Sequence, residues 1–269
     1  MNIKIPKKFM GSPIKGAMQR VLERKDDGGT PPGAGTQNQS TGIILPPTNI
    51  NPSDYVRIPN TNILIVKFEP DEFKGFNYES THVELAKKSL FMPTARIFMP
   101  YFLNVIEACK GNIELFDGNG NKLSSPEIED IYKHLTTAHI NGGAWTWLNG
   151  KAVKGSGFKK LDLETITKVD LSSGTPKFVT NTEPLEACLW NDCYASLDFN
   201  SQGLVKAKAA NQAYEQGSNI YFYYPRKDYV AWFWAYSDRA DFNCFGDPAV
   251  TSASLGVFSC AVGAAQKNS

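Results

Sequence analysis

The chain has 269 residues, of which 28 are Lys or Arg and 27 are Asp or Glu, so its formal net charge is only +1. This balance argues against a protein that binds nucleic acid through bulk positive charge. Hydrophobic residues make up 42% of the chain, which is enough for a real core, but no apolar run approaches the roughly 20 residues of a membrane-spanning helix.

The first sixty residues read as an extension in front of a folded domain. Residues 1–25 are basic but lack the apolar segment of a signal peptide, and within them 14–24 fit a short basic helix. A Gly/Pro/Gln-rich stretch over 25–42 predicts a flexible linker, and the prolines that follow predict extended chain. We therefore expect an N-terminal extension over 1–61 and one domain over 62–269, beginning with the apolar strand ILIVKF.

Helices are predicted in the first half of the domain. A capping box formed by Thr81 and Glu84 predicts a helix over 81–90, and the apolar stretch 101–111 fits a helix or a strand. Asp-Gly and Asn-Gly pairs predict a hairpin turn within 113–124. A strong helical pattern runs over 125–140, with Ser125 as its cap and a proline in the first turn.

Short strands are predicted in the second half. The segments AWTWL, SNIYFYYP, YVAWFWAYS and LGVFSCAV combine aromatic and β-branched residues. Helices followed by a small, mostly antiparallel sheet indicate the α+β class. Trp232 and Trp234 alternate on one strand and so share a face, which we assign to the core.

Several candidate chemical sites are weaker than their structural alternatives. The sequence Asp117–Asn121 has alternating oxygen ligands but lacks the Gly and Glu of a calcium loop, so a tight turn is favoured. The three histidines, His82, His134 and His139, lack metal-site spacing. No nucleophile elbow, phosphate-binding loop or dinucleotide fingerprint is present in the sequence.

The five cysteines are odd in number and lack metal-ligand spacing, which argues against a disulfide-rich scaffold. Cys188 and Cys193 fit either a redox pair or disulfide, or one buried and one incidental thiol. The second interpretation is favoured because the sequence around them shows no positive group that would lower a thiol pKa.

The composition of the C-terminal segment is unusual. Residues 235–265 contain no Lys, Glu, Gln, Met or Trp, although all five types occur elsewhere in the chain. A polar surface loop would normally contain Lys and Glu. Random replacement of the adenines in Asn codons that end in a pyrimidine yields fifteen amino acids and can never yield these five.

Two motifs carry a resemblance to a known family. Ser237–Pro248, followed by Ser254–Val257, resembles the variable C-terminus of target proteins of diversity-generating retroelements, and the nearest type is that of archaea and their viruses. Gly143–Asn149 is similar to the tryptophan-bearing core segment of their C-type-lectin-like fold, which is related to formylglycine-generating enzymes. The resemblance covers 63–264 as architecture and the last forty or so residues as motif.

The resemblance implies a ligand-binding protein, with no catalytic residue, cofactor or metal, whose surface over about 229–257 is diversified by a reverse transcriptase that errs at adenines. Varied side chains would then lie on an exposed, adaptable surface held by a rigid frame. The variable surface is assigned to Tyr236, Asp238, Asp241, Asn243, Phe245, Asp247, Val250, Thr251, Ser252 and Ser254. The scaffold is assigned to Trp145, Trp147, Trp232, Trp234, Arg239, Gly246, Leu255, Gly256 and Val257.

The expected partner is a protein or glycan on a cell surface, with no nucleic acid and no insertion into a membrane. The N-terminal extension would attach the domain to a virion or tail complex, which places the protein on a virion or a cell surface. Two alternatives stay open: a copper- and thiol-dependent oxidative enzyme of the formylglycine-generating type, using Cys244 and Cys260, and an invariant structural module of a virion.

Overall fold

The computed structural model describes residues 8–9, 12–13, 50–137 and 143–263. The chain divides into two compact units, Met1–Ile43 and Ile44–Ser269. In the first unit, β1 (Lys8–Phe9) and β2 (Ser12–Pro13) pair antiparallel. The helix predicted over 14–24 and the linker over 25–42 lie outside the described residues.

The second unit begins earlier than the predicted boundary at residue 62. A short 3-10 helix, η1 (Pro52–Asp54), leads into β3 (Tyr55–Arg57), which pairs antiparallel with β4 (Ile63–Val66). Val56 and Ile65 are buried, so the first of these strands is part of the core and not of an extension. On its other side β4 pairs with β12 (Cys260–Val262), and the strand order of this sheet is β12-β4-β3. The two ends of the described unit therefore lie side by side.

The helix predicted over 81–90 begins three residues earlier and has a different cap. After the 3-10 helix η2 (Asp71–Phe73), α2 spans Tyr78–Lys87, and the Asn77 side chain accepts a hydrogen bond from the Ser80 backbone N–H. Thr81 lies inside the helix and donates its hydroxyl proton to the Asn77 carbonyl. The predicted Thr81–Glu84 capping box is wrong because Asn77 satisfies the free N–H groups one turn earlier.

The other two described helices show the same kind of shift. α3 (Ala95–Cys109) includes Pro100, whereas the sequence predicted an element that begins after this proline. The apolar residues that α3 buries stabilise the helix by more than the loss of the backbone hydrogen bond at the proline destabilises it. α4 spans Ser125–Thr136, and its cap is Ser124 instead of Ser125. The Ser124 backbone N–H and hydroxyl both donate to the Glu127 carboxylate, which completes a capping box.

The larger sheet has seven strands in the order β7-β6-β5-β10-β11-β9-β8. The strands are β5 (Trp145–Lys154), β6 (Leu161–Asp170), β7 (Lys177–Pro184), β8 (Cys193–Ser196), β9 (Asn219–Tyr223), β10 (Val230–Ala235) and β11 (Ala240–Gly246). The pair β11 and β9 is parallel, and the others are antiparallel. The α+β class is confirmed: the described residues form three α-helices with a seven-stranded and a three-stranded sheet in the second unit.

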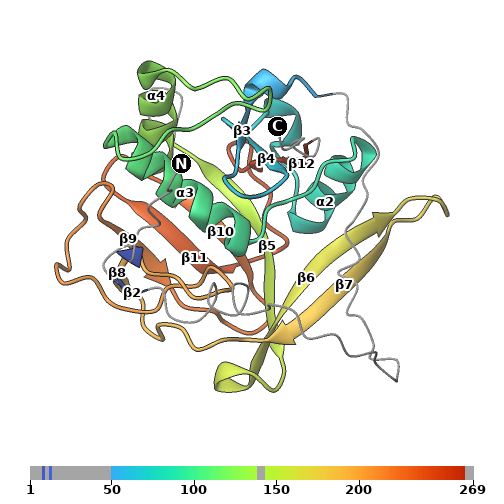
Figure 1. Ribbon diagram of the computed structural model, residues 1–269. Helices are drawn as coiled ribbons and strands as arrows, with labels where there is room; N and C mark the ends of the chain where they lie inside the picture. Colours follow the sequence, from blue (N-terminus) through green and yellow to red (C-terminus); the bar gives the residue numbers. More distant parts are fainter. Residues whose placement is uncertain (1–7, 10–11, 14–49, 138–142, 264–269) are drawn as a thin grey trace, which may run out of the picture. The chain divides into compact units, whose positions relative to one another are not determined.

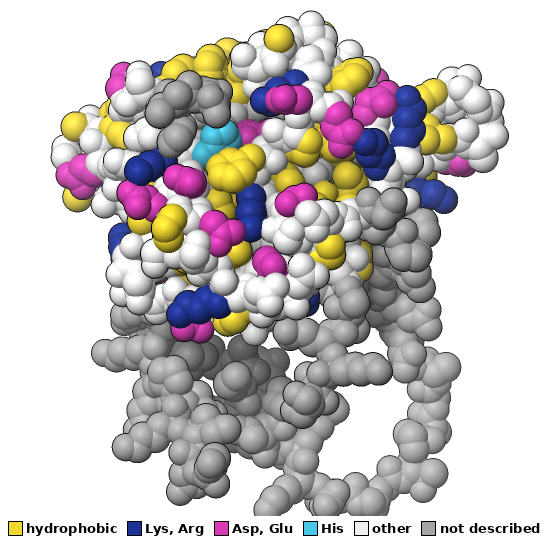
Figure 2. Space-filling model, turned by 90° about the horizontal axis from the view of Figure 1, so that it is seen from above, with side chains coloured by type: hydrophobic (Ala, Val, Ile, Leu, Met, Phe, Trp, Pro, Cys, Tyr) yellow, Lys and Arg dark blue, Asp and Glu magenta, His cyan; other side chains and the backbone are white. Residues whose placement is uncertain are grey.

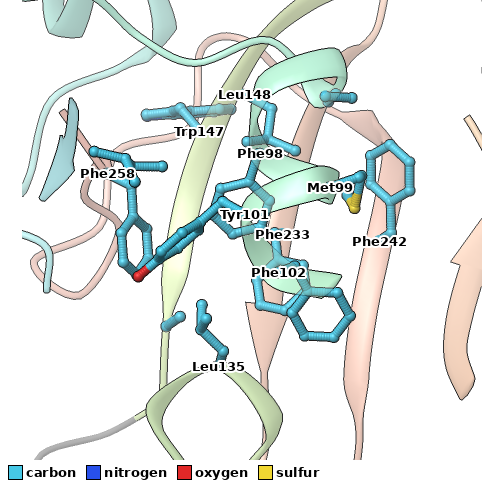
Figure 3. Packing of buried hydrophobic residues seen from close by; sticks show 14 of the residues in the cluster. Phe98, Met99, Tyr101, Phe102, Leu135, Trp147, Leu148, Phe233, Phe242 and Phe258 are labelled. Carbon is cyan, nitrogen blue, oxygen red and sulfur yellow. The ribbon is translucent and has the colours of Figure 1, made fainter. Parts of the chain in front are cut away.

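The main core lies between the large sheet and the helices α3 and α4 (Figure 1), where aromatic rings meet. Phe98 and Phe102 of α3 contact Phe233 of β10, with ring centroids 5.0 and 5.3 Å apart. Phe258, from the segment before β12, packs against Phe98 at 5.5 Å (Figure 3). We call the side of the large sheet that faces α3 the inner face, and the opposite side the outer face.

The surface carries both signs of charge. Figure 2 shows hydrophobic, acidic and basic side chains interspersed over one face of the molecule, as the balanced composition leads one to expect. Large apolar side chains that are well exposed among the described residues are Phe68, Ile113, Phe116 and Val179. In this part of the chain, no helix combines the length and apolar character needed to cross a bilayer.

Candidate ligand-binding face

Strand alternation divides the C-terminal strands into two chemically different faces. On β10 and β11 the paired residues Phe233 and Phe242 point inward and are fully buried. Trp232 pairs with Asn243 and Trp234 with Asp241, and these four side chains belong to the outer face. Both tryptophans are half-buried instead of fully buried: Trp232 packs against the core beside Trp147, whereas Trp234 lies further from it. Phe233 between them is the fully buried residue.

The outer face continues across neighbouring strands through the same register. Trp145 of β5 lies beside Trp234, and Tyr221 and Tyr223 of β9 lie beside Asp241 and Asn243. At the edge of the sheet, Tyr194 of β8 pairs with Tyr221, and their rings meet edge to face at 5.0 Å. We call the partly exposed members of this set the outer aromatic face; they are Trp145, Tyr194, Tyr221, Tyr223, Trp232, Trp234, Tyr236 and Phe245. Trp147, which the register places opposite Trp232, lies on the same side of the sheet but is fully buried beside Tyr78 of α2.

Three rings on this face form a parallel stack. Trp145 stacks on Trp234 with centroids 4.2 Å apart and an interplanar angle of 9°, and Trp234 stacks on Tyr236 at 4.0 Å. The Arg239 guanidinium lies 5.3 Å from the Tyr236 ring and 5.1 Å from the Tyr221 ring. Each ring restricts its neighbour, so the stacked side chains and Arg239 hold one another in position.

Arg239 is fixed from below by Asp241. Its Nε lies 2.9 Å from an Asp241 carboxylate oxygen, and the Asp241 residue is only 3% exposed. Burial raises the pKa of Asp241 to about 6, against the opposing effect of the Arg239 charge. Asp241 was assigned to the ligand-contacting surface; its burial makes it a support for Arg239 instead.

A second arginine is placed in the same way at the other end of β11. The Arg226 guanidinium lies 4.0 Å from the Phe245 ring and 5.0 Å from the Tyr224 ring. Its Nη2 donates to the Asp192 carboxylate at 2.8 Å. Phe245, a predicted surface residue, is half-buried and shares its ring face with this cation. Asn243, between the two arginines, accepts a hydrogen bond from the Phe245 backbone N–H.

The remaining predicted surface residues lie in the loop after β11. Asp247, Thr251 and Ser254 are exposed, whereas Val250 and Ser252 are half-buried. Local hydrogen bonds shape this loop: the Asp247 carboxylate accepts from the Ala249 N–H, and the Ser252 hydroxyl accepts from the Ser254 N–H. The Pro248 carbonyl accepts from the Tyr78 N–H, so the loop is attached to the start of α2. In the turn between β10 and β11, Asp238 is exposed and Tyr236 half-buried.

The predicted scaffold residues of this region are buried. Leu255 and Val257 have no exposed surface, and the backbone of Gly256 exchanges hydrogen bonds with Trp145 and Trp147 of β5. A Cβ on Gly246 would lie 2.7 Å from the Trp232 ring, so only glycine fits beneath that ring. Trp147 is fully buried and its indole N–H donates to the Phe76 carbonyl.

A buried acid supports the aromatic stack from the other side of β5. The Glu69 side chain is 4% exposed; it accepts a hydrogen bond from the Trp145 backbone N–H at 3.0 Å and lies 2.5 Å from His134 Nε2. His82 is also buried, and burial lowers its pKa to about 3. His134 is half-buried, and His139 lies outside the described residues. Glu69 was missed because nothing in its local sequence points to Trp145.

The structure agrees with the interpretations favoured for Cys188 and Cys193 and for the turn over Asp117–Asn121. Cys188 and Cys193 are free, with Cys188 buried and Cys193 half-buried. Asp117 forms a tight turn in which its carboxylate accepts from the Asn119 and Asn121 N–H groups. Among the described residues, no cluster of three or more His, Cys, Asp or Glu side chains is arranged to hold a metal ion.

Tyr194, Tyr221 and Tyr223 of the outer aromatic face, and Arg226 beside it, were given no role from the sequence, while Trp145, Trp232 and Trp234 were assigned to the scaffold. The alternation in SNIYFYYP places Tyr221 and Tyr223 on one side of a strand, which was a usable signal. Tyr194 and Arg226 reach the face only through the sheet order.

Comparisons of the chain with protein-family models, with curated proteins and with solved structures found no match.

Proposed function

We propose that this protein is a ligand-binding module whose C-terminal surface is diversified by adenine-directed retroelement mutagenesis for recognition of a cell surface. The outer aromatic face is the observation that supports this most. It combines tyrosines and tryptophans with Arg239 and Arg226 packed against its rings, and these residue types dominate binding energy at protein interfaces. Their mutual stacking reduces the entropy lost on binding.

The division of β11 into two faces supports the diversification part of the proposal. Phe242 and Cys244 are buried in the core, while Asn243 and Phe245 lie on the outer face. A segment with this alternation tolerates change at every second residue without loss of the fold. The loop over 247–254 adds exposed positions at Asp247, Thr251 and Ser254, where substitution should change stability little.

A C-type-lectin-like fold is part of the same proposal. The three-stranded sheet pairs β4, near the start of the second unit, with β12, near its end. Long irregular segments connect several of the strands that lie between β4 and β12 in the sequence. The oxidative enzyme is less well supported. Burial raises the pKa of both Cys244 and Cys260 well above the usual thiol range, and the two lie in different regions, on β11 and β12. Neither thiol is therefore suited to act as a thiolate.

Deep sequencing of the 3′ end of the gene across its source population, with the flanking DNA, tests the proposal. We expect substitutions at adenines of a nearby near-identical repeat, beside a reverse transcriptase gene. On β11 they should fall at codons 243 and 245 and spare 242 and 244. An identical segment in every copy, with no repeat, would reject diversification and leave an invariant structural module.

A further inference from the structure

The strand β7 has a free edge. It is the last strand in the order of the large sheet and pairs with β6 on one side, while none of the other described strands lies on its other side. Six of its eight residues are exposed, and the hairpin formed by β6 and β7 extends past α2 (Figure 1). Its outward-pointing backbone groups are therefore available to another strand.

This edge lacks the features that keep edge strands from pairing. Natural edges carry charges, prolines or bulges in their middle. In β7 the charged residues Lys177 and Glu183 stand near the two ends, and the five residues between them, FVTNT, are uncharged. The irregularity in the pairing falls on β6, between Ile166 and Lys168, and not on β7. Val179, in the middle, is 50% exposed.

We infer that β7 pairs antiparallel with β7 of a second copy of this chain, with Thr180 opposite its own equivalent. Residues opposite each other must lie on the same face of the sheet, so a shift of the partner by one residue is excluded. Pairing about Thr180 places Val179 opposite Asn181 and Phe178 opposite Thr182. It also places Lys177 of each copy opposite Glu183 of the other.

The charges favour this register over its neighbours. Opposite charges that face each other across two strands stabilise the pair. Glu183 already accepts a hydrogen bond from Arg96 at 2.8 Å, whereas Lys177 makes no ion pair within the described residues. The second copy would bring Lys177 to the free side of Glu183. A register shifted by two residues loses this pair and, in one direction, sets Pro184 opposite Phe178.

Site-specific cross-linking tests the register. In a full-length chain with Cys109→Ser and Cys193→Ser, which removes the more accessible thiols, Thr180→Cys should form a disulfide-linked dimer under mild oxidation. Thr182→Cys is the matched control, with the same side chain on the same face of the strand. Its equivalent would lie about 13 Å away, too far for a disulfide. Equal cross-linking of the two variants would overturn the inference.

Sedimentation of the unmodified protein provides the second measurement. The parent chain should form dimers as its concentration rises. Thr180→Lys should shift it to monomers because two like charges then face each other, whereas Thr182→Lys, opposite Phe178, should weaken the dimer less. Circular dichroism would verify that both variants fold. A parent that stays monomeric, or a dimer unchanged by Thr180→Lys, would refute the pairing without bearing on ligand binding.

Discussion

Asp241 is held in a place where its negative charge is unfavourable. It is almost fully buried on the outer face, and Arg239 compensates only part of the lost hydration. Its pKa of about 6 in the folded protein exceeds the usual value of 3.8. The folded state therefore binds this proton more tightly than the unfolded state does, so stability falls as the pH rises from about 4 to about 6.

We predict that Asp241→Asn removes this part of the pH dependence. In urea unfolding at a series of pH values, the difference in the free energy of unfolding between the parent and the variant isolates the contribution of Asp241 from that of other carboxyls, such as Glu127, whose pKa is lowered. This contribution should fall by at most about 3 kcal/mol between pH 4 and 6. Asp238→Asn removes the smallest of the influences on the Asp241 pKa and is the control, so most of this contribution should remain. A contribution of Asp241 that grows as the pH rises would contradict the sign.

At the scale of elements, the existence of most helices and strands was predictable, but their ends were not. Helix caps were misplaced because several Ser, Thr and Asn residues precede each helix, and only the fold selects among them. β11 was missed because Asp241, Asn243 and Gly246 are typical of loops; it becomes a strand because Phe242 and Cys244 are buried against the core. The alternation in LDLETITKVD was a signal for β6 that was overlooked.

The cap of α4 offers a direct test at this scale. Ser124→Ala should lower the free energy of unfolding by about 1 kcal/mol because it removes the hydroxyl that bonds to Glu127. Ser125→Ala, one residue further on, is a matched control and should change stability by less than about 0.5 kcal/mol. Thermal or urea unfolding of the two variants would decide between the caps. A larger loss of stability for Ser125→Ala than for Ser124→Ala would instead support Ser125 as the cap, as the sequence predicted.

At the scale of the whole sheet, the residues of β10 divide into a fully buried set on the inner face and a half-buried set on the outer face. The inner face of β10 holds the core through Phe233, while the outer face carries the stack around Trp234. This division could be read from alternation only after the sheet order was known. The alternation of Trp232 and Trp234 showed that they share a face but not which face is the core, so they were assigned to it in place of the phenylalanine between them.

Substitutions at these two neighbours should therefore differ in kind. Phe233→Ala should cost about 3–5 kcal/mol of stability because it leaves a cavity against α3. Trp234→Ala should cost about 1–2 kcal/mol, since it removes a half-buried ring from a stack, and should abolish ligand binding. Chemical denaturation gives the first quantity, and binding to a ligand selected with the parent protein gives the second. Equal losses of stability at the two positions would contradict the separation.

The pairing of β4 with β12 has a consequence for synthesis. The strand that completes the small sheet is among the last described residues, and β10 and β11 are also made late. A growing chain cannot finish its fold until β10, β11 and β12 have left the ribosome, and such distant contacts form slowly. A truncated chain that ends before Cys260 would lack β12 altogether. The edge of β4 that β12 covers would then stay open, which would leave the truncated chain prone to aggregation and degradation.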